Sequence, residues 1–149
     1  MATYNKGFTY SAGLRRLGYT NFSLVGINSM STQEDFEACL TLLDGDGEPL
    51  ENPTYPSLSD VLEKANEFVS QQAWYEVRKL RDAHLRDSDY VTAIANETGV
   101  GVSTEWRNYR QGLRDITSQS DPSNLVWPTH PEGQRVGFST GWEPPNSVG

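Results

Sequence analysis

The sequence predicts an α+β fold with a small N-terminal antiparallel β unit, a helical hairpin and an extended C-terminal arm. Apolar residues alternate with polar ones in the first part, which is typical of strands. In the middle they recur every three or four residues, which is typical of helices. After residue 125 the chain carries four prolines and four glycines. We therefore expect a β-containing module at 1–56, a hairpin at 57–117 and an arm at 118–149.

The N-terminal module contains two candidate strands. NFSLVGIN at 21–28 is rich in apolar and β-favouring residues. In FEACLTLL at 36–43, every second residue is apolar, and the polar STQED joins the two candidates. DGDGEP at 44–49 predicts a turn, because aspartate and glycine tolerate the backbone angles of a reversal. It is not a calcium loop of the EF-hand type, because Pro49 and Tyr55 occupy the positions that require glycine and glutamate.

Two helices are expected to form the hairpin. No glycine or proline interrupts residues 57–98, and Ser57 with Asp60 resembles a capping box, so we place a long helix at 58–87. A second helix at 104–116 would be capped by Ser103 or Thr104. The segment between them is polar and predicts a connecting loop. The apolar stripes are Leu62, Ala65, Val69, Ala73, Val77, Leu80 and His84 on the first helix, and Val102, Trp106, Tyr109, Leu113 and Ile116 on the second.

Both helices carry arginines close to acidic residues, as in the dipeptides Arg81-Asp82 and Arg114-Asp115. In an antiparallel hairpin the arginines of one helix can reach carboxylates of the other. The simpler interpretation is a set of exposed ion pairs worth about 0–1 kcal/mol each. Neighbouring Trp74, Trp106 and Tyr109 can shield or stack on guanidinium groups, which favours a partly buried network. On that basis Arg114→Ala should mainly weaken the fold.

Composition argues against several classes of protein. The net charge of −8 and the pI of about 4.7 disfavour nucleic acid binding, which requires a basic face. No apolar run approaches the roughly 20 residues of a membrane-spanning helix, and the first residues lack the apolar core of a signal peptide. Cys39 is the single cysteine, so the chain cannot form an internal disulfide.

No catalytic, metal-binding or cofactor-binding residues are predicted. Cys39, His84 and His130 lack the spacing of zinc ligands, and nothing in the sequence places them together as a catalytic site. The chain has no phosphate-binding loop, no dinucleotide-binding glycine motif and no GxSxG motif. We therefore expect a protein that is not an enzyme and needs no cofactor.

A specific order of residues runs from the first helix into the arm. It begins with Trp74, Arg78, RD at 81–82, Leu85 and SDY at 88–90, continues with YRQGLRDI at 109–116, and ends with VWP at 126–128 and Pro131. This order, over about residues 70–131, resembles the tail assembly chaperone-like family of tailed bacteriophages. Tyr90 stands where that family usually has tryptophan, and the 91–103 segment lacks the family's usual proline-rich start.

The resemblance implies a non-enzymatic role in building the phage tail, and often its fibres. Two interpretations remain open: a virion structural protein that acts as an adaptor in tail, fibre or baseplate, and a transient chaperone that leaves the particle. Expected partners are other phage structural proteins or a second copy of the chain, with no nucleic acid and no membrane. The expected location is the virion, and the host cytoplasm during assembly. The candidate interface residues are Trp74, Arg78, Arg81, Asp82, Leu85, Asp89, Tyr90, Trp106, Tyr109, Arg110, Leu113, Arg114, Asp115, Trp127, Pro128 and Trp142.

Overall fold

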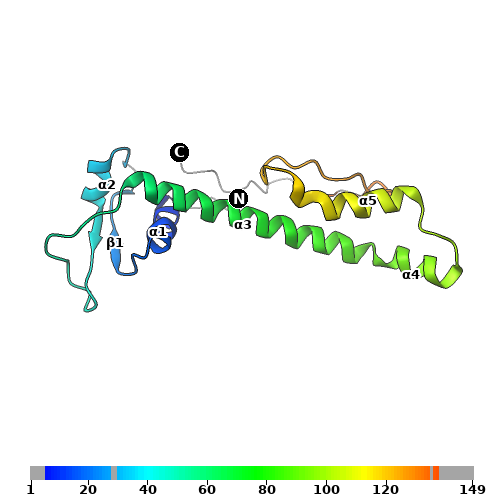
Figure 1. The fold of residues 1–149 in the computed structure, drawn as a ribbon, viewed down its shortest axis with the longest axis horizontal. Coiled ribbons are helices and arrows are strands. Elements are labelled where there is room, and N and C mark those ends of the chain that lie inside the picture. Colours follow the sequence, from blue (N-terminus) through cyan, green and yellow to red (C-terminus); the bar gives the residue numbers. More distant parts are fainter. Residues whose placement is uncertain (1–5, 28–29, 135, 138–149) are drawn as a thin grey trace. The chain divides into compact units, whose positions relative to one another are not determined.

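The computed structural model describes residues 6–27, 30–134 and 136–137, and it confirms the α+β class (Figure 1). By contacts the chain divides within a long helix, between Gln71 and Gln72, into an N-terminal and a C-terminal unit. The elements are α1 (Lys6–Arg16), β1 (Phe22–Leu24), α2 (Gln33–Cys39), β2 (Leu40–Leu42), α3 (Leu58–Asp87), α4 (Asp89–Thr98), α5 (Thr104–Arg114) and the 3₁₀ helix η2 (Asp115–Ser118).

The N-terminal unit packs α1, α2 and the start of α3 around a two-stranded sheet. β1 and β2 are antiparallel, with Phe22 opposite Leu42 and Leu24 opposite Leu40. A Cβ atom added at Gly13 would lie 2.2 Å from the Val61 carbonyl oxygen, so α1 approaches α3 as closely as glycine permits. The buried core consists of Tyr10, Leu14, Met30, Phe36, Leu40, Leu42 and Val61.

The predicted strand at 36–43 is wrong over its first half, where the chain forms α2. The STQED segment, expected to be a connection, contains the signal that starts this helix. The Thr32 side chain accepts a hydrogen bond from the Asp35 backbone N–H at 3.1 Å, and the Asp35 carboxylate accepts one from the Thr32 N–H at 3.1 Å. This reciprocal capping box satisfies two N–H groups at the helix start, so only residues 40–42 are extended. Cys39 is the last, half-buried residue of α2.

The long helix α3 has the predicted bounds, and its start is fixed by two capping interactions. The Ser57 hydroxyl accepts a hydrogen bond from the Asp60 N–H at 3.1 Å, as the capping pattern predicted. The Gln33 side-chain amide accepts from the Leu58 N–H at 2.6 Å and donates to the Pro56 carbonyl at 3.2 Å. The helix buries a row of residues spaced by four: Val61, Ala65, Val69, Ala73 and Val77.

The loop predicted between the two helices is also wrong over most of its length, because residues 89–98 form α4. The helix ends at Gly99, whose φ of 69° places it in the left-handed region that glycine adopts without strain. None of the α4 residues is fully buried. The true connection between α4 and α5 is residues 99–103.

In the C-terminal unit, α5 runs alongside α4 and the last turns of α3 (Figure 1). Ser103 is its N-cap, as one of the two predicted candidates, and accepts a hydrogen bond from the Trp106 N–H at 3.4 Å. Tyr109, Leu113 and Ile116 of the predicted apolar stripe are buried. Within the described residues of the whole chain, no helix is long and apolar enough to cross a membrane.

The segment after α5 turns back and packs on the helix. The Gln119 amide pairs with the backbone of Val126, accepting from its N–H and donating to its carbonyl, both at 2.9 Å. A Cβ atom added at Gly112 of α5 would lie 2.8 Å from the Pro128 Cβ, so the two are in direct contact. We call residues 127–131 the strap. Trp142 and the other residues from 138 onward, which belong to the predicted arm, lie outside the described residues.

Candidate functional site

Arg110 of α5 ties the hairpin together at the junction between α3 and α4. One guanidinium nitrogen donates to the Leu85 carbonyl at 2.9 Å and to the Ser88 hydroxyl at 2.6 Å. The other donates to the Asp89 carboxylate at 2.8 Å. Arg110 is only 9% exposed and Ser88 only 1%, so the contact between them lies inside the protein, while the contacts with Leu85 and Asp89 are partly buried. The fork-shaped guanidinium reaches all three acceptors, which the single ammonium group of a lysine would do poorly.

Ser88 lies at the junction between α3 and α4, and its hydroxyl is one of the acceptors of Arg110. Its hydroxyl donates back to the carbonyls of His84 and Leu85, at 2.9 and 3.0 Å, in the manner of serines that bend helices. The same oxygen accepts the Arg110 proton, so one hydroxyl joins the end of α3 to α5. A buried hydroxyl used as both donor and acceptor fixes the angle at which the chain passes from α3 into α4.

The strap closes the hairpin through a cluster of aromatic rings. His130 is buried with its ring centroid 4.9 Å from those of both Trp106 and Tyr109, in edge-to-face geometry. Trp106 also meets Tyr90 edge to face at 5.9 Å. The Tyr90 hydroxyl donates to the Glu132 carboxylate at 3.1 Å, which links α4 to the residue after the strap. Edge-to-face pairs of this kind are worth about 0.5–1.5 kcal/mol each beyond their buried area.

Other predicted interface residues occupy different environments. Arg81 pairs with its neighbour Asp82 on α3 at 2.7 Å, a contact within one helix. Within the part of the chain that the structure describes, Arg78 and Arg114 are exposed and make no hydrogen bond or ion pair. Asp115 accepts two hydrogen bonds from the Gln111 amide, both at 3.0 Å. The fold-stabilising contact expected of Arg114 is therefore made by Arg110.

The hydrophobic members of the predicted set pack inside the C-terminal unit. Tyr109 and Leu113 are buried in the hairpin, and Trp74 and Leu85 are half-buried on α3. Trp127 of the strap lies edge to face with His84 of α3, with centroids 6.2 Å apart. The set therefore combines residues that hold the hairpin closed with exposed residues such as Arg78 and Arg114.

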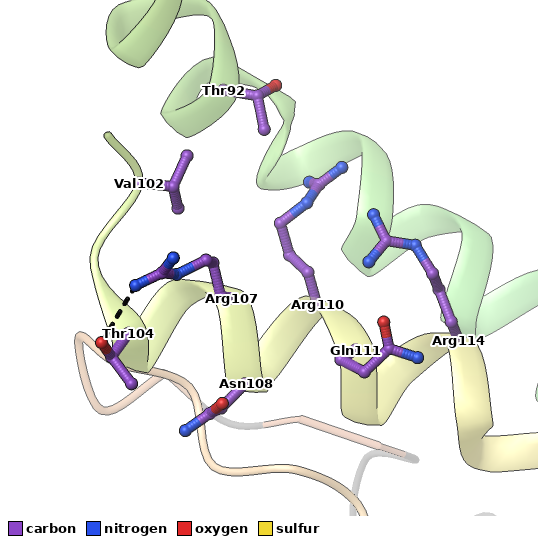
Figure 2. A pocket seen from close by; sticks show the side chains of 8 residues that line it. All are labelled: Thr92, Val102, Thr104, Arg107, Asn108, Arg110, Gln111 and Arg114. Carbon is purple, nitrogen blue, oxygen red and sulfur yellow. Dashed lines mark hydrogen bonds between the residues drawn. The ribbon is translucent and has the colours of Figure 1, made fainter. Parts of the chain in front are cut away.

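A groove beside α5 is lined by three arginines (Figure 2). It has a volume of about 660 Å³, and Arg107, Arg110 and Arg114 line it together with side chains of α4 and the 99–103 connection. Arg107 donates to the Thr104 hydroxyl at 3.2 Å, and no acidic residue lines the groove. The groove is therefore locally basic on a chain whose net charge is −8.

Four titratable groups of the C-terminal unit are shifted by their surroundings. Hydrogen bonds with its own backbone N–H and with Ser103 lower the pKa of Glu105, and the Arg107 guanidinium adds to this effect. Burial lowers the pKa of His84, an effect that the nearby Asp87 carboxylate partly opposes, and its Nε2 is buried without a hydrogen-bond partner among the described residues. Burial raises the pKa of Tyr109. Burial and the hydrogen bond to Glu132 raise the pKa of Tyr90. These shifts follow from packing and hydrogen bonding, and no two of these groups form a nucleophile–base pair.

The described residues contain no group of three or more histidine, cysteine or acidic side chains placed to hold a metal ion. Cys39 lies in α2 of the N-terminal unit and His84 in the C-terminal part of α3, so they belong to different units. The arrangement can position and present side chains, but it does not assemble the donors that metal chemistry requires.

Ser88, His130 and Gly112 make close contacts within the hairpin and are absent from the predicted set. The sequence pattern pointed to two of these positions. Ser88 is the first residue of SDY at 88–90, and His130 lies between VWP at 126–128 and Pro131. Gly112 separates Gln111 from Leu113 in an otherwise regular helix, and glycine inside a helix costs about 1 kcal/mol relative to alanine. That cost is a sign of a close contact, here with Pro128.

Comparison with known proteins agrees with the resemblance noted in the sequence. Residues 74–132 match the model of a family described as phage tail assembly chaperone protein. The matched segment contains the end of α3, α4, α5 and the strap, and thus every residue of the Arg110 contacts and the aromatic cluster. No curated protein and no solved structure matches the chain significantly. The match supports a role in phage tail assembly and favours a non-enzymatic one.

Proposed function

We propose that this protein is a non-enzymatic adaptor of bacteriophage tail assembly that binds other tail proteins through its helical hairpin. The observation that carries this proposal is the family match over residues 74–132, which coincides with the hairpin closed by Arg110 and the strap. The matched residues thus include those that set the hairpin's shape. A protein that works by presenting a fixed surface needs such rigid closure.

Helix α4 supplies a surface suited to protein contacts. It buries none of its residues, yet Tyr90 and Ile94 are large, 46% and 52% exposed, and one turn apart on the same face. Exposed apolar side chains that gather on one element are typical of protein interaction sites. Val100, just beyond the helix, is 69% exposed. We propose that this face of α4 contacts a tail, fibre or baseplate subunit.

We propose that the adaptor remains in the virion. The N-terminal unit has its own hydrophobic core and lies almost wholly outside the matched residues, which supports a second attachment surface beside the hairpin. The alternative is a transient chaperone that covers tail or fibre subunits and then leaves, which the family description favours. Both functions place the protein in the host cytoplasm during assembly, and they differ in its presence in finished particles.

Quantitative mass spectrometry of purified virions separates these two fates. A retained adaptor gives a fixed number of copies per particle, equal in preparations purified by different methods. If finished particles lack the protein while tail assembly still depends on it, the chaperone function is correct. If a phage without the gene builds normal tails, the adaptor proposal is wrong in both forms.

Substitution on α4 tests the proposed surface. Ile94→Asp places a charge on the apolar face, and we expect it to reduce tail assembly while the melting temperature stays within a few degrees. Asn96→Asp adds the same charge about 200° around the helix, on the other side, and serves as the matched control. Equal assembly by both variants would exclude this face of α4 as the contact.

A further inference from the structure

We propose that the groove lined by Arg107, Arg110 and Arg114 binds a short acidic peptide segment of a partner tail protein. The partner's nature rests on the proposed function, whereas the preference for an acidic peptide rests on the groove itself. Side-chain carboxylates of the segment would bind the guanidinium groups, and its backbone would lie along α5.

The three arginines form a row of the right length for such a segment. They lie at successive turns of one helix, and Figure 2 shows them on the side of α5 that lines the groove. At about 1.5 Å per residue, Arg107 and Arg114 are separated by about 10 Å along the helix axis. An extended peptide covers that distance in about three residues, and its alternate side chains point to the same side. A volume of about 660 Å³ is typical of a specific ligand site.

Two of the three guanidinium groups form no ion pair or hydrogen bond with a carboxylate in the part of the chain that the structure describes. Among the described residues Arg107 donates to the Thr104 hydroxyl and lies close enough to Glu105 to lower the pKa of that carboxyl, while Arg114 makes no hydrogen bond or ion pair. Arg110 is held by Leu85, Ser88 and Asp89, so the middle of the row is fixed before a ligand arrives. A preorganised site loses less conformational entropy when it binds.

The surroundings of the row favour a peptide over a nucleic acid. The chain has 20 acidic and 12 basic residues, so a long polyanion is repelled by most of the surface, while a short segment meets only the local field. The groove is also lined by the amides of Asn108 and Gln111 and by the aliphatic side chain of Val102. Amides can pair with a peptide backbone, and an aliphatic wall suits the apolar side chains of a peptide.

Fluorescence anisotropy with the full-length protein tests this inference. The probe is a labelled octapeptide in which glutamate alternates with valine, and the matched probe has glutamine in place of each glutamate. We expect the acidic probe to bind, to weaken with added salt, and to bind better than the neutral probe. Arg107→Gln and Arg114→Gln should each raise Kd by about three- to tenfold, the loss of one partly solvated charge-assisted hydrogen bond.

Arg78→Gln is the matched control, since Arg78 is an exposed arginine of α3 that does not line the groove. It should change Kd by less than about twofold, within the usual effect of a distant surface substitution. Equal binding of the two probes, or an equal effect of Arg78→Gln, overturns the inference. Tighter binding of a single-stranded oligonucleotide or of inorganic phosphate overturns it in favour of a phosphate site.

Failure of this inference can be told apart from failure of the proposed function. If tail assembly requires the protein but the acidic probe does not bind, the groove inference alone is wrong. If the acidic probe binds as expected but a phage without the gene builds normal tails, the proposed function is wrong and the groove remains a peptide site.

Discussion

Replacing Arg110 with alanine should open the hairpin, because this side chain links α5 to the junction between α3 and α4. The substitution removes hydrogen bonds to the Leu85 carbonyl, the Ser88 hydroxyl and the Asp89 carboxylate. The first acceptor is partly buried and the second is buried, and water replaces a lost donor poorly at such positions. The third belongs to a side chain that is 61% exposed, so water screens that ion pair strongly.

The expected loss of stability follows from these three contacts. Each hydrogen bond from a charged donor to a buried or partly buried acceptor is worth about 1.5 kcal/mol at the low end of the usual range. The exposed ion pair adds at most about 1 kcal/mol. The Nε of Arg110 is buried without a partner, so removing it recovers part of the loss. Arg110→Ala should therefore lower the free energy of unfolding by about 2–4 kcal/mol.

Tryptophan fluorescence during urea unfolding is a suitable assay, since the three tryptophans among the described residues, Trp74, Trp106 and Trp127, all lie in the C-terminal unit. Arg110→Lys keeps the charge but not the fork, and should recover only part of the loss. Arg114→Ala, on the same helix and exposed, should change stability by less than about 0.5 kcal/mol. Equal losses for Arg110→Ala and Arg114→Ala would refute the assignment of the buried contact to Arg110.

Three further substitutions test the strap, the N-cap of α2 and the half-buried His84. Gly112→Ala should destabilise the hairpin and expose Trp127 to water, seen as a red shift in fluorescence, because the added Cβ would lie 2.8 Å from Pro128; greater stability from better helix propensity would contradict this contact. Thr32→Ala should cost about 1 kcal/mol through loss of the α2 cap, and amide exchange should accelerate in α2 while α5 stays protected; unchanged exchange in α2 would contradict the capping role. The lowered pKa of His84 means that the folded state binds its proton less readily than the unfolded state does, so stability should fall as pH drops through about 6.5 towards the lower folded pKa. His84→Leu should reduce that pH dependence, and an unchanged slope would assign it to other groups.

The sequence was sufficient for the long helix and for α5. Residues 57–98 contain no glycine or proline, and the capping pattern at Ser57 lies where α3 begins. Ser103 likewise precedes α5, and of the predicted apolar stripe Tyr109, Leu113 and Ile116 are buried while Val102 and Trp106 are half-buried. The apolar pattern between 33 and 43 was ambiguous, because Phe36 and Leu40 fit a helix face as well as an alternating strand. The capping box at Thr32 decides for the helix in residues 33–39.

Helix α4 was not predicted because its segment carries few apolar residues among polar ones and none of its residues is fully buried. The sequence predicted that arginines of one helix reach carboxylates of the other. In the structure Arg110 meets one carboxylate, that of Asp89 in α4, and its other two acceptors are the Leu85 carbonyl and the Ser88 hydroxyl. These acceptors could not be predicted, since a periodicity gives the face of a helix but not the angle at which two helices meet. That angle depends on the hydrogen bonds of Ser88.

The sequence by itself determined the class of fold, the long helix and the resemblance of about residues 70–131 to phage tail assembly proteins, because these depend on local propensity and on the order of a few residue types. Only the tertiary structure decided the roles of the three arginines of α5. Arg110 is buried against Leu85 and Ser88, while Arg107 and Arg114 line an open groove. These residues are chemically identical and lie on one helix face, and what separates them is the position of a neighbouring helix that local sequence does not specify.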